Sequence, residues 1–255
     1  MPQMPAARST MAVLRYLARR SGPVRASTIA RDLGLPRSSA YQLLGVMLDE
    51  GFLVHYPEDR TYGLSTLVSE IGSSALRTAR LAQLAGPLME RLVAAVSLPA
   101  VAHLAVLSGS DVSYAARVQG FRAPTTVSGI GVRLPAHLTA TGRAMLSGLP
   151  HAQVRALYAH SADLPLRTGS GPGSLAELDR LLELGRVRGW SREDGDIQSD
   201  YSSVAASALD HNDYPIAAIG LTFRATAVDR TDWLPLGDAV RGAANALTAR
   251  LRGQR

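Results

Sequence analysis

Two short helical patterns separated by a tight turn are the feature that most constrains the first part of this chain. Apolar residues at helical spacing predict one helix over residues 27–33 and another from Pro36 to residues 49–50. Gly34 suits the left-handed conformation that ends a helix, and Pro36 suits the first turn of the next, where its missing N–H is harmless. With a further helix predicted over residues 9–19, this pattern indicates a helix-turn-helix.

A hairpin is predicted directly after these helices. Residues 52–56 and 61–64 have the composition of strands, and the turn tetrapeptide Pro57-Glu58-Asp59-Arg60 separates them. A hairpin that follows the second helix of a helix-turn-helix is a wing. Residues 1–64 are therefore predicted to form a winged helix-turn-helix domain.

The positive charge of the chain is concentrated at its N-terminal end. All 27 basic residues are arginines and the net charge is +6, yet residues 1–47 hold seven arginines against Asp32 alone. The rest of the chain is therefore neutral. Because arginines that neutralise phosphates drive DNA affinity, this asymmetry predicts a polyanion-binding module joined to a neutral one. A fluctuation of surface charge is the alternative.

Composition excludes several other classes of protein. A hydrophobic fraction of 46% with 19% charged residues is typical of globular domains. The absence of cysteine removes disulfides, thiolate nucleophiles and cysteine zinc sites. No apolar run approaches the roughly 18 residues of a membrane span, and the first residues lack the apolar stretch of a signal peptide. We therefore expect a cytoplasmic protein that does not bind a membrane.

The remainder of the chain mixes helical and strand patterns. Apolar Leu67, Val68, Ile71, Ala75 and Leu76 predict a linker helix over residues 65–80, followed by another helix over 81–97. Strands are then predicted over residues 100–107, 112–118, 202–209 and 216–222, and helices over 139–149, 151–160, 174–188 and 234–251. Because the connections have hairpin length, we expect an α+β fold with helices packed on an antiparallel sheet.

Three segments, in their order and spacing, resemble the IclR family of bacterial regulators. They are residues 29–44 with the wing end Tyr62-Gly63-Leu64, residues 133–146, and Gly189-Trp190 followed by 203–206, Asp210 and 216–219. The resemblance implies a winged helix-turn-helix (1–64), a linker helix that mediates dimerisation (65–80) and a GAF-like effector domain (81–255). It also implies homodimers or dimers of dimers on a pseudo-palindromic operator in double-stranded DNA, a small organic or aromatic acid as effector, and no cofactor.

The start of the third helix carries the candidate DNA contacts, because that end of a recognition helix approaches base edges. The candidates are Arg37, Ser38, Ser39, Tyr41 and Gln42, with Arg60 at the wing tip. Arginine can pair with guanine or grip phosphate, and glutamine can read adenine. The alternatives are that Tyr41 packs against the second helix, that Arg37 is a solvated charge, and that Arg60 is an ordinary turn residue.

The resemblance places an effector pocket between the loop before residue 139 and two late strands. One wall comprises Leu134, Ala140 and Thr141, and the other comprises Glu193, Ser203, Gly220 and Thr222. Free N–H groups at the start of a helix favour an anion, which suits an acidic effector. Two positions depart from the family pattern, since Ser203 replaces the usual cysteine and Gly189-Trp190 with Glu193 replaces Gly-Tyr-x-x-Asp.

Structural roles are the alternatives for these residues. Thr139 and Thr141 can merely cap a helix, Ser203 can be a small core residue, and the strand residues Tyr114 and Tyr201 are more typical of core than of a pocket wall. For His137 we favour a hydrogen bond that fixes its loop.

An enzyme and a protein-docking module are the rival function classes. An enzyme would need a motif such as Gly-x-Ser-x-Gly, His-Glu-x-x-His or a phosphate loop, and the sequence has none of them. A protein-docking winged helix is the other rival, and the charge asymmetry argues against it.

Overall fold

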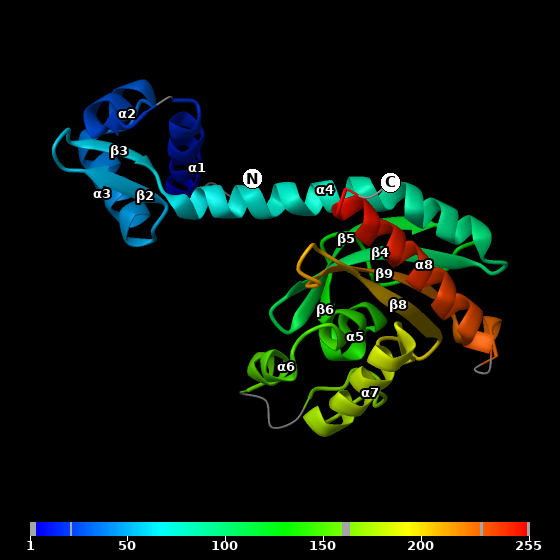
Figure 1. Ribbon diagram of the computed structural model, residues 1–255. Helices are drawn as coiled ribbons and strands as arrows, with labels where there is room; N and C mark the ends of the chain where they lie inside the picture. Colours follow the sequence, from blue (N-terminus) through cyan, green and yellow to red (C-terminus); the bar gives the residue numbers. More distant parts are fainter. Residues whose placement is uncertain (1–3, 21, 160–163, 230–231, 254–255) are drawn as a thin grey trace. The chain divides into compact units, whose positions relative to one another are not determined.

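The computed structural model describes residues 4–20, 22–159, 164–229 and 232–253 (Figure 1). Packing divides the chain into two compact units, residues 1–77 and 78–255.

The first unit is a winged helix-turn-helix. It contains α1 (Pro5–Ala18), α2 (Ala26–Asp32) and α3 (Arg37–Asp49), with a small antiparallel sheet of β1 (Val24–Arg25), β3 (Thr61–Leu64) and β2 (Leu53–Tyr56) in that order. Gly34 takes the left-handed conformation in the turn between α2 and α3, with φ of 64°. The core comprises Val13, Leu17, Ala26, Ile29, Leu44, Met47 and Leu53. These elements confirm the predicted helix-turn-helix and wing.

A single helix, α4 (Thr66–Ala95), replaces the two helices predicted over 65–80 and 81–97. The junction at Arg80 and Leu81 has no glycine, proline or capping residue to end a helix, and Pro87 lies within the helix without ending it. The later part of α4 packs into the core of the second unit through Leu81, Ala85, Leu88, Met89 and Leu92.

The second unit is built on a six-stranded sheet with the strand order β6-β5-β4-β9-β8-β7, in which every neighbouring pair is antiparallel. The strands are β4 (Ala100–Ser108), β5 (Asp111–Gln119), β6 (Arg133–Pro135), β7 (Ser191–Asp194), β8 (Tyr201–Leu209) and β9 (Pro215–Arg224). This topology confirms the predicted α+β class. The edge strands β6 and β7 were not predicted, because three or four residues are too few for alternation to be recognised.

Helices cover both faces of this sheet (Figure 1). The later part of α4 and α8 (Trp233–Leu251) pack on one face. The other face carries α5 (Ala140–Ser147), which follows the short helix η1 (Ala136–Leu138), together with α6 (His151–Leu157) and α7 (Leu175–Arg188). The predicted end of α6 at His160 lies outside the described residues. None of the helices among the described residues is long and apolar enough to cross a membrane.

Candidate functional site

The first half of α3 presents the predicted DNA contacts to solvent. Arg37, Ser38, Ser39, Tyr41 and Gln42 are all exposed, whereas the buried side of the helix carries Ala40, Leu44 and Met47. The side chain of Tyr41 is 55% exposed, so it does not pack in the core against α2. The amphipathic pattern of α3 thus brings the five candidates to one accessible surface.

The sixth candidate, Arg60, lies at the wing tip and is exposed. Its backbone is left-handed, with φ of 50°, and two acidic residues, Glu58 and Asp59, precede it in the same turn. The tip of the wing therefore carries net negative charge, unlike the start of α3.

One acidic side chain engages two of the N-terminal arginines. Asp32 accepts a hydrogen bond of 2.7 Å from the Tyr16 hydroxyl and forms ion pairs with Arg20 at 3.2 Å and Arg31 at 3.0 Å. The Tyr16 hydrogen bond, together with Arg31, holds the pKa of Asp32 below its ordinary value. Among the described residues, five of the N-terminal arginines have no ion pair: Arg8, Arg15, Arg19, Arg25 and Arg37.

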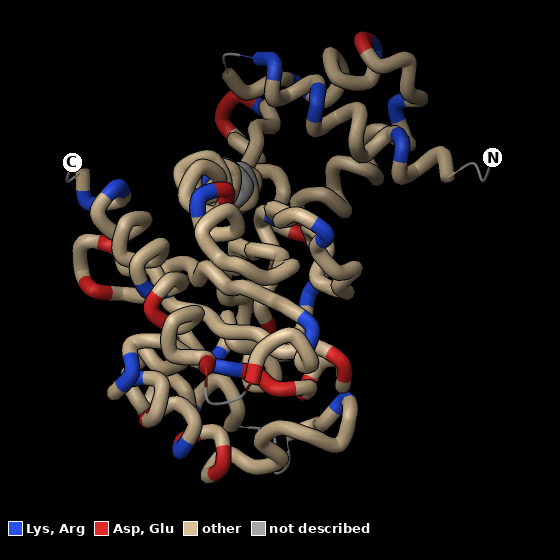
Figure 2. The backbone as a smooth tube through the Cα atoms, turned by 90° about the vertical axis from the view of Figure 1, so that its right-hand side faces the viewer, with Lys and Arg blue, Asp and Glu red and all other residues tan. Residues whose placement is uncertain are grey.

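The excess of positive charge is smaller when the whole first unit is counted. Residues 1–77 contain nine arginines and six acidic residues, and the latter include Asp49, Glu50, Glu58 and Asp59. The net charge of the unit is thus +3. Figure 2 marks the basic and acidic positions along the chain. The free arginines lie mainly in and around α1 and at the start of α3.

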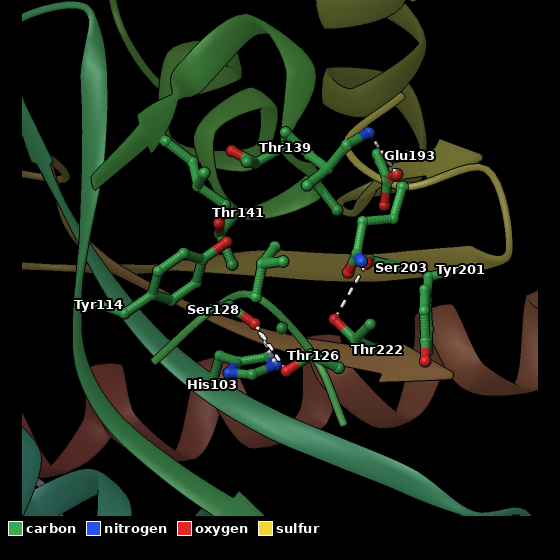
Figure 3. Close-up of a pocket in the computed structure, with 16 residues that line it drawn as sticks. His103, Tyr114, Thr126, Ser128, Thr139, Thr141, Glu193, Tyr201, Ser203 and Thr222 are labelled. Atoms are coloured by element: carbon green, nitrogen blue, oxygen red, sulfur yellow. Dashed lines mark hydrogen bonds between the residues drawn. The ribbon is translucent and has the colours of Figure 1, made fainter. Parts of the chain in front are cut away.

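The second unit contains a pocket against the sheet face that α5 covers (Figure 3). All seven predicted effector residues line it, from β6, α5, β7, β8 and β9: Leu134, Ala140, Thr141, Glu193, Ser203, Gly220 and Thr222. The cavity volume is about 30 Å³, which is room for about one or two water molecules. A small organic ligand would therefore have to displace side chains that line the pocket in this structure.

The start of α5 offers two free backbone donors to the pocket. The Thr139 side chain caps the helix by accepting from the N–H of Gly142 at 3.0 Å, and the Thr139 carbonyl accepts from the N–H of Arg143 at 3.0 Å. Within the described part of the chain, the N–H groups of Ala140 and Thr141 have no hydrogen-bond acceptor in the helix or the preceding turn. Because the helix dipole adds positive potential there, this end of the pocket favours an anion.

Glu193 is buried in the opposite wall and bonded to its own loop. Its carboxylate oxygen Oε1 accepts from the backbone N–H groups of Asp196 at 3.0 Å and Ile197 at 3.3 Å. Asp196 in turn pairs with the buried guanidinium of Arg143, which also donates to two backbone carbonyls. Burial raises the pKa of Glu193 to about 7, so the carboxyl is partly protonated at neutral pH.

Two hydroxyls complete this wall. Ser203 and Thr222 are opposite each other in the register of β8 and β9, and their side-chain oxygens are 3.0 Å apart. Either hydroxyl can turn toward a bound molecule while the other accepts its hydrogen bond. Ser203 is therefore a polar pocket residue rather than a small core residue.

Sequence reasoning missed the polar group on a third side of the pocket. His103 on β4 is buried, and its Nε2 lies 3.1 Å from the Ser128 hydroxyl, which donates to the Thr126 hydroxyl at 3.0 Å. Burial lowers the pKa of His103 to about 3, with Arg117 adding to the effect, so the ring is neutral. A histidine within the otherwise apolar run 100–107 was the available signal.

Other lining residues were also outside the prediction. Tyr114 and Tyr201, expected as core, both line the pocket, as do Val127, Thr139, Ile197 and Gln198. Burial raises the pKa of Tyr114 to about 12, so its hydroxyl stays neutral. His137 does not line the pocket, and its Nε2 is 3.0 Å from the carbonyl of Pro165, which agrees with the loop-fixing hydrogen bond.

Comparison with protein families identifies both units. Residues 73–249 match the family model described as the C-terminal domain of the bacterial transcriptional regulator IclR, and residues 7–57 match the IclR helix-turn-helix domain. The chain belongs to the IclR family. Members of the IclR family are transcription regulators and not enzymes, so this protein is a DNA-binding regulator with an effector-binding C-terminal domain.

Individual IclR relatives match over nearly the whole chain. The acetate operon repressor of Salmonella typhimurium is 28% identical over 95% of this chain and 88% of its own length. The crystal structure of Thermotoga maritima IclR superposes with a TM-score of 0.66 at 22% identity, covering 98% of this chain and 99% of that one. An IclR homolog of Microbacterium hydrocarbonoxydans, solved in complex with 4-hydroxybenzoate, gives a TM-score of 0.61 at 24% identity, covering 98% and 100%.

Proposed function

We propose that this protein is a sequence-specific transcription regulator whose DNA binding is modulated by a small organic or aromatic acid. The observation that carries the proposal is the convergence of all seven predicted effector residues on one pocket, in a different unit from the helix-turn-helix. A ligand in that pocket cannot compete directly for the surface of α3. Its effect on DNA binding is therefore a coupling between two sites.

In the proposed complex the carboxylate lies at the N–H groups of Ala140 and Thr141, with the hydroxyls of Ser203 and Thr222 assisting and Leu134 as the apolar wall. Glu193 then selects the rest of the ligand, because an ionised carboxylate would repel a second acid group. A ligand with one acid and one hydrogen-bond donor is favoured over a dicarboxylate. The complex of the Microbacterium homolog with 4-hydroxybenzoate supports this class.

The proposed DNA contacts are the five candidates in the first half of α3, with Arg60 as a backbone contact: Arg37, Ser38, Ser39, Tyr41 and Gln42. The protein would bind as a homodimer, or as a dimer of dimers, to pseudo-palindromic half-sites about one DNA turn apart. The linker part of α4 supports this, since Ile71 is 54% exposed and Leu76 is 73% exposed. The side chain of Ala75 lies outside the described residues. Because the proposed operator is on the chromosome, the protein would act in the cytoplasm.

We propose the domain boundaries as the resemblance implies them, with the winged helix-turn-helix over 1–64, the linker over 65–80 and the effector domain over 81–255. The boundary along the chain between the two compact units lies within α4, between Arg77 and Thr78. The linker and effector domain thus share one continuous helix.

The proposal is tested by selecting DNA with the purified protein. Sheared genomic DNA from the source organism is incubated with the protein at low salt, and the retained fragments are sequenced. We expect a pseudo-palindromic motif, an affinity that falls steeply with salt, and a changed affinity when 4-hydroxybenzoate or another hydroxylated acid is added. Failure to retain any duplex at low salt would refute the DNA-binding proposal.

A further inference from the structure

The pocket lacks a cation to match the acid proposed for it. Among the described residues that line it there is no arginine or lysine, the ring of His103 is neutral, and Glu193 is the one acidic side chain. The donors that remain for a carboxylate are uncharged, namely the two backbone N–H groups at the start of α5 and hydroxyls such as those of Ser203 and Thr222. A charge from outside the lining is needed to offset the loss of hydration of a buried anion.

Arg117 does not line the pocket itself but lies on β5 beside the lining residue His103 on β4. In the sheet register Gly220 on β9 is opposite His103 on β4, and His103 is opposite Arg117 on β5. Thr141 lies against Gly220, so the four residues form a row from the start of α5 across three strands. Directly opposite residues point to the same face, which places Arg117 on the pocket face, about 10 Å from Gly220 at a spacing of about 4.8 Å per strand.

The guanidinium of Arg117 has donors without acceptors. Its Nε and Nη2 atoms are buried, and neither makes a hydrogen bond to any acceptor in the described part of the chain. No acidic residue among those described forms an ion pair with Arg117. A half-buried positive charge without a partner is unfavourable, and a nearby anion would relieve it.

We infer that Arg117 supplies the positive charge that selects an anionic ligand, acting across His103 rather than by direct contact. The inference rests on the proposed effector function. His103 separates Arg117 from the cavity and stays uncharged, so it does not screen the arginine. Inside the protein a charge at this distance still interacts appreciably with an anion at the start of α5. Arg117 is therefore a positioning residue for ligand charge, and a neutral analogue should not sense it.

The test compares carboxylates with their amides. The ligand pairs are acetate with acetamide, benzoate with benzamide, and 4-hydroxybenzoate with 4-hydroxybenzamide. Each compound is added to wild type, to Arg117→Gln, to Arg117→Lys and to the exposed control Arg155→Gln. Binding is measured by calorimetry and thermal shift. We expect wild type and Arg155→Gln to prefer the carboxylate of at least one pair. Arg117→Gln should lose at least tenfold in affinity for that carboxylate with the amide unchanged, and Arg117→Lys should recover most of it.

A second measurement does not depend on the folding of Arg117→Gln. In wild type labelled with 15N-arginine, the Nε–H resonance of Arg117, assigned by its absence in Arg117→Lys, should shift with the carboxylate and not with the amide. If wild type prefers carboxylates but Arg117→Gln keeps that preference, or the resonance does not move, the role of Arg117 is refuted while the proposed function stands. If no carboxylate binds wild type, both fail.

Discussion

Gly220 lies so close to Thr141 that a Cβ atom at position 220 would come within 2.7 Å of the Thr141 Cγ2 methyl group. Thr141 is branched at Cβ and 4% exposed, so this methyl cannot move aside easily. The close approach brings the start of α5 onto the floor of the pocket.

Substitution Gly220→Ala should therefore destabilise the protein by about 1 to 3 kcal/mol through overpacking. The double variant Gly220→Ala with Thr141→Ser, which removes the methyl group, should recover most of that loss. Gly242→Ala in α8 is the control, since apart from the backbone of its own helix turn and its chain neighbours no described atom lies within 4 Å of its added Cβ, and it should be neutral or stabilising. Urea unfolding measures all three. Additive effects at positions 220 and 141 would show that the contact is not tight.

Filling the pocket should separate the two functions of the protein. Thr141→Trp is expected to abolish stabilisation by an effector, which mass action sets at about 2.7 kcal/mol at a hundredfold excess over the dissociation constant. DNA binding without effector should be retained, because Thr141 lies outside the helix-turn-helix unit. Val187→Trp, at a position 80% exposed on α7, is the control for the added indole. Equal stabilisation of wild type and Thr141→Trp would place the ligand elsewhere.

Glu193 should make stability depend on pH in a defined direction. Its pKa is about 7 in the folded protein against an ordinary 4.5, so the folded state binds more protons than the unfolded state between these values. Stability contributed by the neutral carboxyl is thus fully present below pH 4.5 and is lost as pH rises through 7.

Glu193→Gln removes this titration. The unfolding free energy of the variant relative to wild type should therefore rise by on the order of 2 to 3 kcal/mol between pH 4.5 and pH 8. Other titrating groups are shared and cancel in the difference. Urea unfolding at four pH values measures it, and a difference that does not vary with pH would show that Glu193 has an ordinary pKa.

Much of the fold was predictable because its signals are local. Gly34 and Pro36 mark the turn between α2 and α3, and Ser174 and Gly189 lie at the two ends of α7, where one caps the helix and the other takes the left-handed conformation. The continuity of α4 was missed because a change of packing partner near Arg80 looks like a helix boundary when only apolar spacing is read, although the absence of a helix-ending residue there was a signal for one helix.

The pocket residues that belong to the family pattern were predictable, whereas those brought together only by the tertiary structure were not. The seven residues carried over from the resemblance all line it. His103, Thr126 and Ser128 come together because β4 and the loop after β5 meet in space, and no spacing between positions 103 and 128 encodes that contact. Tyr114 fits the pattern of a core strand, and it is also a pocket wall.

The exposed apolar side of the linker should hold two protomers together. Ile71→Glu places a charge where the proposed dimer buries an apolar side chain, so it should weaken self-association at least tenfold and weaken DNA binding with it. Val187→Glu, also at an exposed apolar position, is the control. Sedimentation at micromolar concentration measures the association. Wild type that sediments as a monomer would contradict the dimer.

Arg37 at the start of α3 is exposed and has no ion pair among the described residues. If the Arg37 guanidinium contacts a base, Arg37→Ala should weaken operator binding by about 1 to 3 kcal/mol and flatten the sequence preference at one base pair. If it contacts a phosphate instead, the substitution should weaken binding to all sequences equally and lower the slope of affinity against salt by about one. Arg155→Ala, exposed on α6, is the control. Anisotropy titrations on the operator and its single-base variants at several salt concentrations distinguish these outcomes. Unchanged affinity and salt slope would mean that Arg37 does not face the DNA.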